Sequence, residues 1–154
     1  MKIFTLYREQ ELPISTDEAW AFFSSPKNLD KITPPQLGFV IKSQLNEGGI
    51  FPGMKIQYTV RPLLGIPLNW ITEISEVNAP HLFTDRQLKG PYALWEHTHF
   101  FTTVAGGVKM RDEVKYSLPL GWLGLVAHKL IVRKKLVEIF DFRKKVLEQI
   151  FAKK

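Results

Sequence analysis

The sequence predicts an α+β protein with a seven-stranded antiparallel sheet, two short helices after the first strand, and a long C-terminal helix that closes the fold. Three observations support this class. Polar and apolar side chains alternate in several stretches separated by turn residues, which is typical of strands in a meander. Helix-starting residues follow the first of these stretches. From Gly121 onward, apolar side chains instead recur every three or four residues, which indicates one amphipathic helix.

The N-terminal part of the chain predicts a strand followed by two short helices. Residues 1–11 alternate in polarity and suit a strand. Ser15 or Thr16 can cap the next segment, because a side-chain oxygen accepts from the free amides of a first helical turn. Pro26 ends this helix. A second helical turn is expected over residues 28–32, and a Pro-Pro pair ends it.

The middle of the chain predicts antiparallel strands joined by short connections rich in glycine and proline. The clearest connection lies at residues 105–107, where Ala-Gly-Gly joins two long alternating stretches into a hairpin. Together with the first strand, these stretches give a sheet of seven members. The six later strands are expected at residues 39–45, 54–63, 68–77, 82–88, 94–104 and 108–118.

The C-terminal helix is expected to be long enough to cross the face of the sheet. About thirty residues at ~1.5 Å each give a length of roughly 45 Å. The apolar seam expected to face the sheet consists of Leu123, Ala127, Leu130, Val137, Phe140, Leu147 and Phe151.

Length and composition indicate a single domain, residues 1–154, with one core. The chain has 45% hydrophobic and 23% charged residues, close to the averages of globular domains, so intrinsic disorder is excluded. The lack of cysteine excludes disulfides, thiolate nucleophiles and zinc sites built on sulfur. No stretch is apolar for long enough to span a membrane, and the N-terminus does not read as a secretory signal. We therefore expect a cytoplasmic protein.

The excess positive charge lies at the end of the chain. Residues 128–154 carry 9 basic and 3 acidic side chains, whereas residues 1–127 carry 12 of each. Because cations on the outer face of a helix usually keep it solvated, we expect no specific nucleic-acid partner, only weak salt-sensitive binding. Weak contact with an anionic membrane is the alternative. The cations concerned are Lys129, Arg133, Lys134, Lys135, Arg143, Lys144 and Lys145.

Strand alternation places polar side chains inside the sheet. In residues 94–104 the odd positions share one face, and Trp95 and Phe101 favour an inward orientation for it. His97 and His99 then point inward as well. On the flanking strands, the inward side chains are expected to be Phe83, Asp85 and Gln87 on one side and Met110, Asp112, Val114, Tyr116 and Leu118 on the other.

The hairpin register decides which histidine meets which carboxylate. A turn centred near Gly106 places His99 opposite Asp112, and a one-pair slip would instead place His97 there. We therefore expect one of the two imidazoles within hydrogen-bonding reach of this carboxylate. The other expected pairs are Phe101 with Met110, His97 with Val114 and Trp95 with Tyr116.

A further set of residues indicates which fold of this class the chain adopts. It consists of Phe83, Asp85, Gln87, Gly90, Pro91, Trp95, His97, His99, Phe101, Gly106, Gly107, Met110, Asp112, Tyr116, Pro119 and Gly121. These residues, together with the predicted order of strands and helices, resemble the START-related SRPBCC superfamily, whose members have the helix-grip fold. That superfamily includes lipid-transfer domains, plant hormone-binding proteins of the pollen-allergen type and polyketide cyclases. The similarity spans essentially the whole chain. The nearest branch is an uncharacterised bacterial one, described in part as cyclases or dehydratases and in part as cell-division inhibitors.

The resemblance implies a curved sheet wrapped around the C-terminal helix, with a deep cavity between them. Such a cavity would hold a hydrophobic or amphipathic small molecule, such as a lipid, a polyketide-like compound or an aromatic metabolite, and would need no cofactor. The side chains expected to bind it are Phe83, Asp85, Gln87, Trp95, His97, His99, Phe101, Met110, Asp112, Tyr116 and, if Thr72 and Ile74 share its face, Trp70.

The inward polar cluster has three interpretations, because unpaired buried polar groups are unfavourable. The favoured one is a hydrogen-bonded network that supports the core or recognises the polar end of a ligand. The alternative is acid–base catalysis of a cyclisation or dehydration, in which Asp112 orients His99 or His97. The third is a metal site built from these two imidazoles and Asp112. We expect no metal, and a binding protein rather than an enzyme.

Positions in the fold can also be predicted for four residues outside this polar cluster. Trp20, Trp70 and Trp122 are expected in the core or the cavity wall. His128, at the start of the long helix, is expected at the surface or in a groove.

Overall fold

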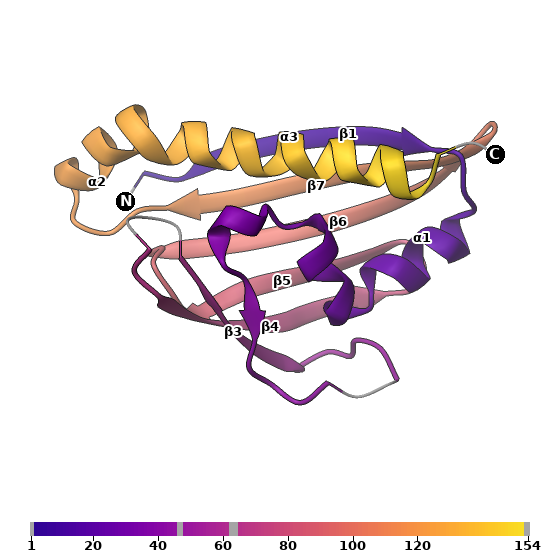
Figure 1. Ribbon diagram of the computed structural model, residues 1–154, viewed down its shortest axis with the longest axis horizontal. Helices are drawn as coiled ribbons and strands as arrows, with labels where there is room; N and C mark the ends of the chain where they lie inside the picture. Colours follow the sequence, from indigo (N-terminus) through magenta and orange to yellow (C-terminus); the bar gives the residue numbers. More distant parts are fainter. Residues whose placement is uncertain (1, 46–47, 62–64, 153–154) are drawn as a thin grey trace.

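The protein forms one antiparallel sheet covered by helices on one face (Figure 1). The computed structural model describes residues 2–45, 48–61 and 65–152. Within these ranges seven strands pair in the order β1-β7-β6-β5-β4-β3-β2, which confirms the predicted class. The strands are β1 (Phe4–Leu12), β2 (Val40–Ile41), β3 (Lys55–Val60), β4 (Leu68–Asn78), β5 (Leu82–Lys89), β6 (Leu94–Val104) and β7 (Gly107–Ser117).

The helices come from the segment after β1 and from the C-terminal end. α1 contacts β6 and β7, whereas η1 contacts α3, so the two groups of helices meet over the sheet. Figure 1 shows α3 running along β1 and β7. The helices are α1 (Thr16–Phe23), the 3₁₀ turns η1 (Pro26–Ile32) and η2 (Pro35–Leu37), α2 (Trp122–Ala127), the π-helical turn η3 (His128–Val132) and α3 (Arg133–Ile150).

The start of α1 has the cap that its sequence predicts. Ser15 Oγ accepts from the Glu18 amide at 3.0 Å, which satisfies one of the free donors of the first turn. Asp17 and Glu18 lie at the positive end of the helix dipole. Pro26 then opens η1, so the second helical turn is confirmed as a 3₁₀ helix.

One expected strand is much shorter than predicted. The stretch at residues 39–45 pairs only through β2, which has two residues. Lys42 N and Ser43 N both donate to Gln57 O, at 2.8 and 3.2 Å, and Ser43 Oγ accepts from Gln57 N at 2.6 Å. Two successive donors on one carbonyl interrupt the one-to-one ladder, so the strand ends there.

The remaining strand predictions are close. β1, β4, β5, β6 and β7 begin and end within three residues of the expected bounds. The strand expected at residues 54–63 corresponds to β3. Residues 62 and 63 of the expected strand lie outside the described residues, and so do Met1 and residues 153–154 of the expected first strand and last helix.

The C-terminal helix is continuous from α2 to α3, but its first half does not bury the predicted seam. Leu123 is 51% exposed and Leu130 is 68% exposed. Gly124 and His128 are buried instead. A Cβ at Gly124 would lie 2.3 Å from Pro119 O, so only glycine lets the backbone of α2 pack this closely. Trp122, expected in the core, is 72% exposed.

In α3 the buried face contains a charged residue. The buried side chains are Leu136, Phe140, Arg143 and Leu147, at spacings of four and three. Phe140 and Leu147 were predicted. Arg143 was expected among the solvated cations, and this is wrong, because the residue is only 8% exposed.

Three apolar clusters surround the middle of the sheet. One lies between α1 and the strands β6 and β7, and includes Phe23 and Phe101. A second lies under α3, and includes Leu136 and Phe140. The third lies at the β3 and β4 edge, around Ile56. No helix of the described ranges is long and apolar enough to cross a membrane.

Candidate functional site

The strand register brings the predicted polar side chains to one interior. β6 and β7 pair with His99 opposite Asp112, as the hairpin predicts. On the other side of β6, Asp85 of β5 stands opposite His97. The other predicted pairs, namely Phe101 with Met110, His97 with Val114 and Trp95 with Tyr116, are present.

Each histidine bonds to the carboxylate diagonal to it. His97 Nε2 donates to Asp112 Oδ1 at 2.8 Å, which confirms the expected imidazole–carboxylate contact. His99 Nε2 donates to Asp85 Oδ2 at 2.9 Å. Diagonal neighbours on one face of a sheet are within reach of a long ring side chain. The two imidazoles therefore bond in opposite directions, one to β7 and one to β5.

His99 is held between two rings. Its imidazole stacks on His97, with centroids 3.8 Å apart, and on Phe83, with centroids 4.2 Å apart. Burial, together with the charge of His97, lowers the pKa of His99 to about 4. At neutral pH His99 is uncharged, so its Nδ1, 3.4 Å from Asp112 Oδ1, is an acceptor and not part of an ion pair. Nδ1 has no hydrogen-bond partner among the described residues.

Both carboxylates are kept ionised. Burial alone would raise the pKa of Asp112, but the charge of Arg143 and the hydrogen bond from His97 lower it below its ordinary value. Burial also opposes the ionisation of Asp85, but the hydrogen bond from His99 favours it. The pKa of Asp85 is therefore lowered as well. The site therefore contains two negative charges on half-buried side chains.

Arg143 brings a cation to the same place from α3. Its Nη2 lies 3.7 Å from Asp112 Oδ1, and its guanidinium lies over the rings of Phe23 and Phe140, 5.4 and 5.7 Å from their centroids. Nε and Nη2 find no hydrogen-bond partner in the described part of the chain. Arg143 thus has two buried donors without a hydrogen bond, and its side chain also lines a cavity.

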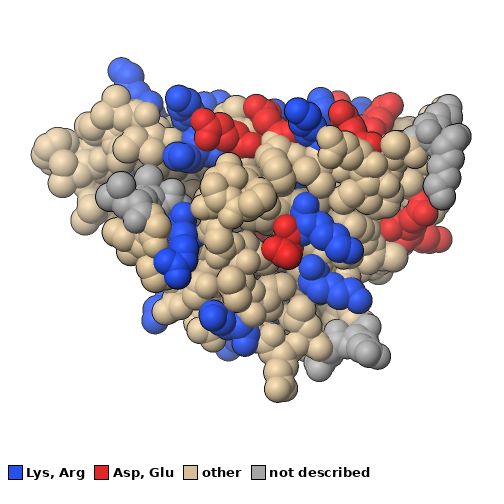
Figure 2. Space-filling view, viewed as in Figure 1, with Lys and Arg blue, Asp and Glu red and all other residues tan. Residues whose placement is uncertain are grey.

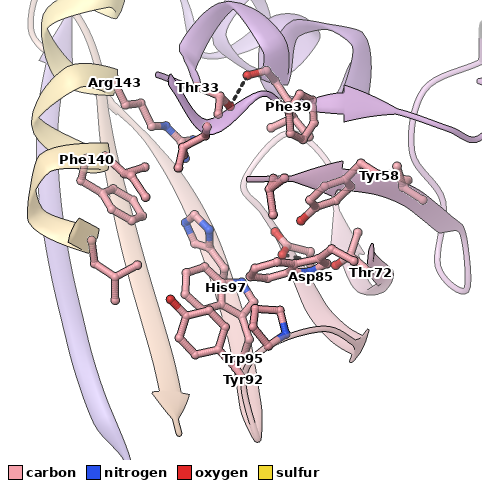
Figure 3. Close-up of a pocket in the computed structure, with 18 of the residues that line it drawn as sticks. Thr33, Phe39, Tyr58, Thr72, Asp85, Tyr92, Trp95, His97, Phe140 and Arg143 are labelled. Atoms are coloured by element: carbon pink, nitrogen blue, oxygen red, sulfur yellow. Dashed lines mark hydrogen bonds between the residues drawn. The ribbon is translucent and has the colours of Figure 1, made fainter. Parts of the chain in front are cut away.

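The cavity has a volume of about 400 Å³ and lies between the sheet, η1 and the C-terminal helix. Figure 3 shows His97 and Asp85 on its floor, with Arg143 and Phe140 approaching from the helix and Tyr58 and Trp95 from the sheet. Most of its lining is aromatic or aliphatic. Such a pocket suits a small molecule with an apolar body and one polar end.

An aromatic wall forms one side of the cavity. Trp70 lies near the centre of this wall, with ring centroids 5.7 Å from Tyr58, 5.6 Å from Tyr92 and 5.4 Å from Trp95. Burial, with the charge of Asp85, raises the pKa of Tyr58 well above its ordinary value, so its hydroxyl stays protonated. Trp70 Nε1 is a buried donor that finds no acceptor among the residues described.

The structure divides the expected ligand-binding residues into two groups. Phe83, Asp85, Trp95, His97, His99 and Trp70 line the cavity, and Thr72 and Ile74 share the inward face of Trp70 as required. The cavity lining does not include Gln87, Phe101, Met110, Asp112 and Tyr116.

Each residue of the second group has another position. The Gln87 amide bonds to the backbone of Tyr92 at 2.7 and 3.1 Å and holds the turn before β6. Phe101 and Met110 pack in the core beneath α1. Asp112 lies behind His97 and orients it rather than facing the cavity.

Tyr116 and His128 form a second buried pair, which sequence reasoning missed. Tyr116 Oη lies 2.7 Å from His128 Nε2, and Phe4 stacks on the imidazole with centroids 3.5 Å apart. Burial and the charges of Arg133 and Lys2 lower the pKa of His128. His128 was expected at the surface or in a groove, and this is wrong, because η3 turns it onto β1 and β7.

Sequence reasoning also missed several cavity residues. Tyr58 follows the inward alternation of β3, so the pattern that identified Trp70 could have found it. Thr72 was named only as a neighbour of Trp70 on the same face, and not as a cavity residue. Arg143 falls on the helical spacing of Phe140 and Leu147, which was a usable signal. It was overlooked because an arginine is usually exposed.

The side chains of Asp85, His97 and His99 are the described group that could hold a metal ion, with ligand atoms within 4.8 Å of one another. The carboxylate of this candidate metal site is Asp85, whereas the sequence interpretation expected Asp112. Both Nε2 atoms already donate to carboxylates, and Arg143 brings a positive charge close by. These features favour a hydrogen-bonded network over a metal site.

Comparisons with known proteins show the fold. No model of a protein family and no curated protein matches the chain. Among solved structures, the chain is similar to protein CV1439 from Chromobacterium violaceum, at 13% identity and a TM-score of 0.72, over 97% of this chain and 98% of that one.

Two further solved structures agree. Protein Ms6760 from Mycobacterium smegmatis is 16% identical with a TM-score of 0.66, and Ara h 8.0201 is 17% identical with a TM-score of 0.64. In both cases the match covers 97% of this chain and 98% of the other. At these identities the likeness shows the helix-grip fold alone.

Proposed function

We propose that the protein binds a hydrophobic or amphipathic small molecule in the cavity between the sheet and the C-terminal helix, in the cytoplasm. The observation that carries this proposal is a cavity of about 400 Å³ with a mostly apolar lining and a polar group formed by His97, His99, Asp85 and Arg143. A volume of this size suits a lipid chain, a polyketide-like compound or an aromatic metabolite. The resemblance to the SRPBCC superfamily and its uncharacterised bacterial branch supports the same function.

The free polar atoms indicate the chemistry of the ligand. Arg143 and Trp70 have donors without acceptors among the described residues, and His99 Nδ1 has no donor. These atoms have almost no accessible surface, so a ligand can pair with them only where the neighbouring side chains move. Because unmatched buried groups are unfavourable, such a ligand would bring acceptor oxygens to Arg143 and Trp70 and a hydroxyl to His99. A hydroxylated acid or ketone with an apolar body meets these requirements.

The first experiment is native mass spectrometry of the untagged protein, which should show a co-purified molecule released on denaturation. Binding can also be followed with the fluorescent probe anilinonaphthalene sulfonate. Ile139→Trp should reduce its uptake at least about tenfold, because Ile139 lines the cavity and a larger ring would fill it.

Ile150→Trp is the matched control, since Ile150 is exposed near the end of the same helix. It should bind the probe as the wild type does. If both variants bind equally, the probe does not enter the cavity and the proposal fails.

The alternative function is that of a cyclase or dehydratase acting in the same cavity. The observation in its favour is the neutral His99, which lines the cavity and has an unprotonated, buried Nδ1. This nitrogen would take a proton from a carbon next to a ligand carbonyl if the imidazole turned toward the ligand. Asp112 would act by orienting His97 and not by touching the substrate. Turnover of β-hydroxy ketones that is lost in His99→Ala but kept in His81→Ala, at an exposed histidine, would favour this function over simple binding.

A further inference from the structure

Large apolar side chains are exposed where β7 passes into the C-terminal helix. Trp122 is 72% exposed and Leu130 is 68% exposed, although such residues are rarely gathered on a surface without a partner. We call this set the apolar patch. It consists of Leu120, Trp122, Leu123, Leu125, Val126, Leu130 and Ile131.

The packing of α2 and η3 presents this patch outward. Gly124 and His128, four residues apart, are buried against the rest of the protein. Trp122, Val126 and Leu130 follow at the same spacing on another side of the helix, and all three are exposed. The inner face is occupied, so the patch cannot turn inward without breaking the contacts of His128.

The apolar patch lies in a part of the sequence that contains basic residues and no acidic ones. Lys129, Arg133, Lys134 and Lys135 are exposed, and the sequence has no Asp or Glu between Glu113 and Glu138. Figure 2 shows the uncharged lobe at the α2 end of the molecule, with Lys and Arg gathered beside it. Apolar side chains edged by cations are typical of helices that lie in the interface of a membrane.

We propose that the apolar patch and these four cations dock the protein on an anionic lipid bilayer. Lipid headgroups satisfy both features, because apolar side chains enter the acyl boundary while each cation strengthens binding about fivefold. A second copy of this chain is a poorer partner. A symmetric pairing through the patch would place the four cations of each copy near those of the other.

The docking surface and the cavity share two exposed residues, Ile131 and Lys135. Leu118, Ile131, Val132 and Lys135 belong to the cavity lining, and two of them are also in the docking surface. A docked molecule would therefore open its cavity toward the bilayer, so that an apolar ligand could pass without crossing water. This last step, unlike docking itself, rests on the proposed function.

The test is flotation of the full chain with vesicles of phosphatidylcholine containing about a third phosphatidylglycerol. We expect flotation at about 50 mM salt that is lost at about 500 mM, because salt screens the cations. Vesicles of phosphatidylcholine alone should bind much less. Absence of flotation at the lower salt would overturn docking but leave the proposed function intact, since ligand uptake is measured separately.

Two double variants separate charge from apolar insertion. Lys134→Glu with Lys135→Glu should bind at least about thirtyfold more weakly. Trp122→Ser with Leu130→Ser should bind at least about tenfold more weakly, and both positions are exposed, so folding should be unaffected. Equal binding of this second variant and the wild type would contradict insertion.

The matched control is Lys144→Glu with Lys145→Glu, a pair of exposed cations farther along the same helix. It has the same change of charge and should float as the wild type does. If it loses binding as fully as the variant at Lys134 and Lys135, the attraction is general and no docking surface exists. Binding to an acidic protein instead of vesicles would likewise overturn the membrane as the partner.

Discussion

His97 and His99 lie two residues apart on one face of β6, yet their surroundings give them different chemistry. His97 donates to Asp112 behind it. His99 donates to Asp85, at the cavity wall, and lies between the rings of His97 and Phe83. The stacked rings exclude water from His99, so its neutral form is favoured and its Nδ1 stays unprotonated.

This environment predicts a pH dependence of stability. The pKa of His99 is lowered by burial to about 4, against about 6.5 in an unfolded chain. Between these values the unfolded state binds a proton that the folded state does not, so the free energy of unfolding falls as the pH decreases. From pH 7 to pH 5 we expect a loss of about 2 kcal/mol from His99. His128 adds to the same trend, since its pKa is also lowered.

Urea unfolding at the two pH values measures the effect. His99→Gln should flatten the dependence, whereas His81→Gln, at an exposed position, should leave it unchanged. The carboxylates do not interfere, because their lowered pKa values contribute stability that is lost only below about pH 4. An unchanged slope in His99→Gln would contradict the assignment.

At the scale of elements, the C-terminal helix shows how one glycine sets the orientation of a segment. The three-to-four spacing from Gly121 onward predicts the helix correctly, but Gly124 and His128, not Leu123 and Leu130, face inward in its first half. Close approach of the helix backbone to Pro119 is more favourable here than burial of the larger side chains. The turn η3 then adds a wider helical turn before α3.

This contact predicts the effect of Gly124→Ala. The added Cβ would lie 2.3 Å from Pro119 O, so α2 must move away from the end of β7. We expect a loss of about 1 to 3 kcal/mol in unfolding free energy and faster amide exchange in α2. Gly48→Ala, where nothing lies within 4 Å of the added atom, is the control and should change little. Equal stability of the two variants would show that α2 does not depend on this contact.

At the scale of the whole molecule, the cavity exists because the helices and the sheet leave space between three apolar clusters. Phe23 belongs to the cluster under α1, Ile56 to that at the sheet edge and Phe140 to that under α3, and all three side chains line the cavity. No single one of these clusters encloses the cavity. The single-domain assignment stays a prediction, and so does the expectation of no specific nucleic-acid partner.

The hydrogen-bonded network predicts that the protein does not depend on a metal. Asp85, His97 and His99 already pair with one another or with Asp112, and Arg143 disfavours a further cation nearby. A chelator such as EDTA should therefore leave the Tm and the uptake of anilinonaphthalene sulfonate unchanged. Elemental analysis of the untagged protein checks this directly, and stoichiometric metal would instead favour the group formed by Asp85, His97 and His99 as its site.

Much of the site could be predicted from the sequence because side-chain direction in a strand has a period of two. Alternation put His97 and His99 on one face of their strand, and Trp95 and Phe101 on that face indicated that it points inward. The turn at Gly106 determined the register that brings His99 opposite Asp112. These are local properties of neighbouring residues in the chain.

The tertiary structure decided which side chains of that interior face the cavity. Whether an imidazole bonds to Asp85 or Asp112 depends on diagonal distances across two strand pairs. Whether Arg143 turns inward and Trp122 outward depends on how the C-terminal helix is rotated against the sheet. That rotation follows from backbone contacts such as that of Gly124, which involve segments folded against one another and leave no periodic signal in the sequence.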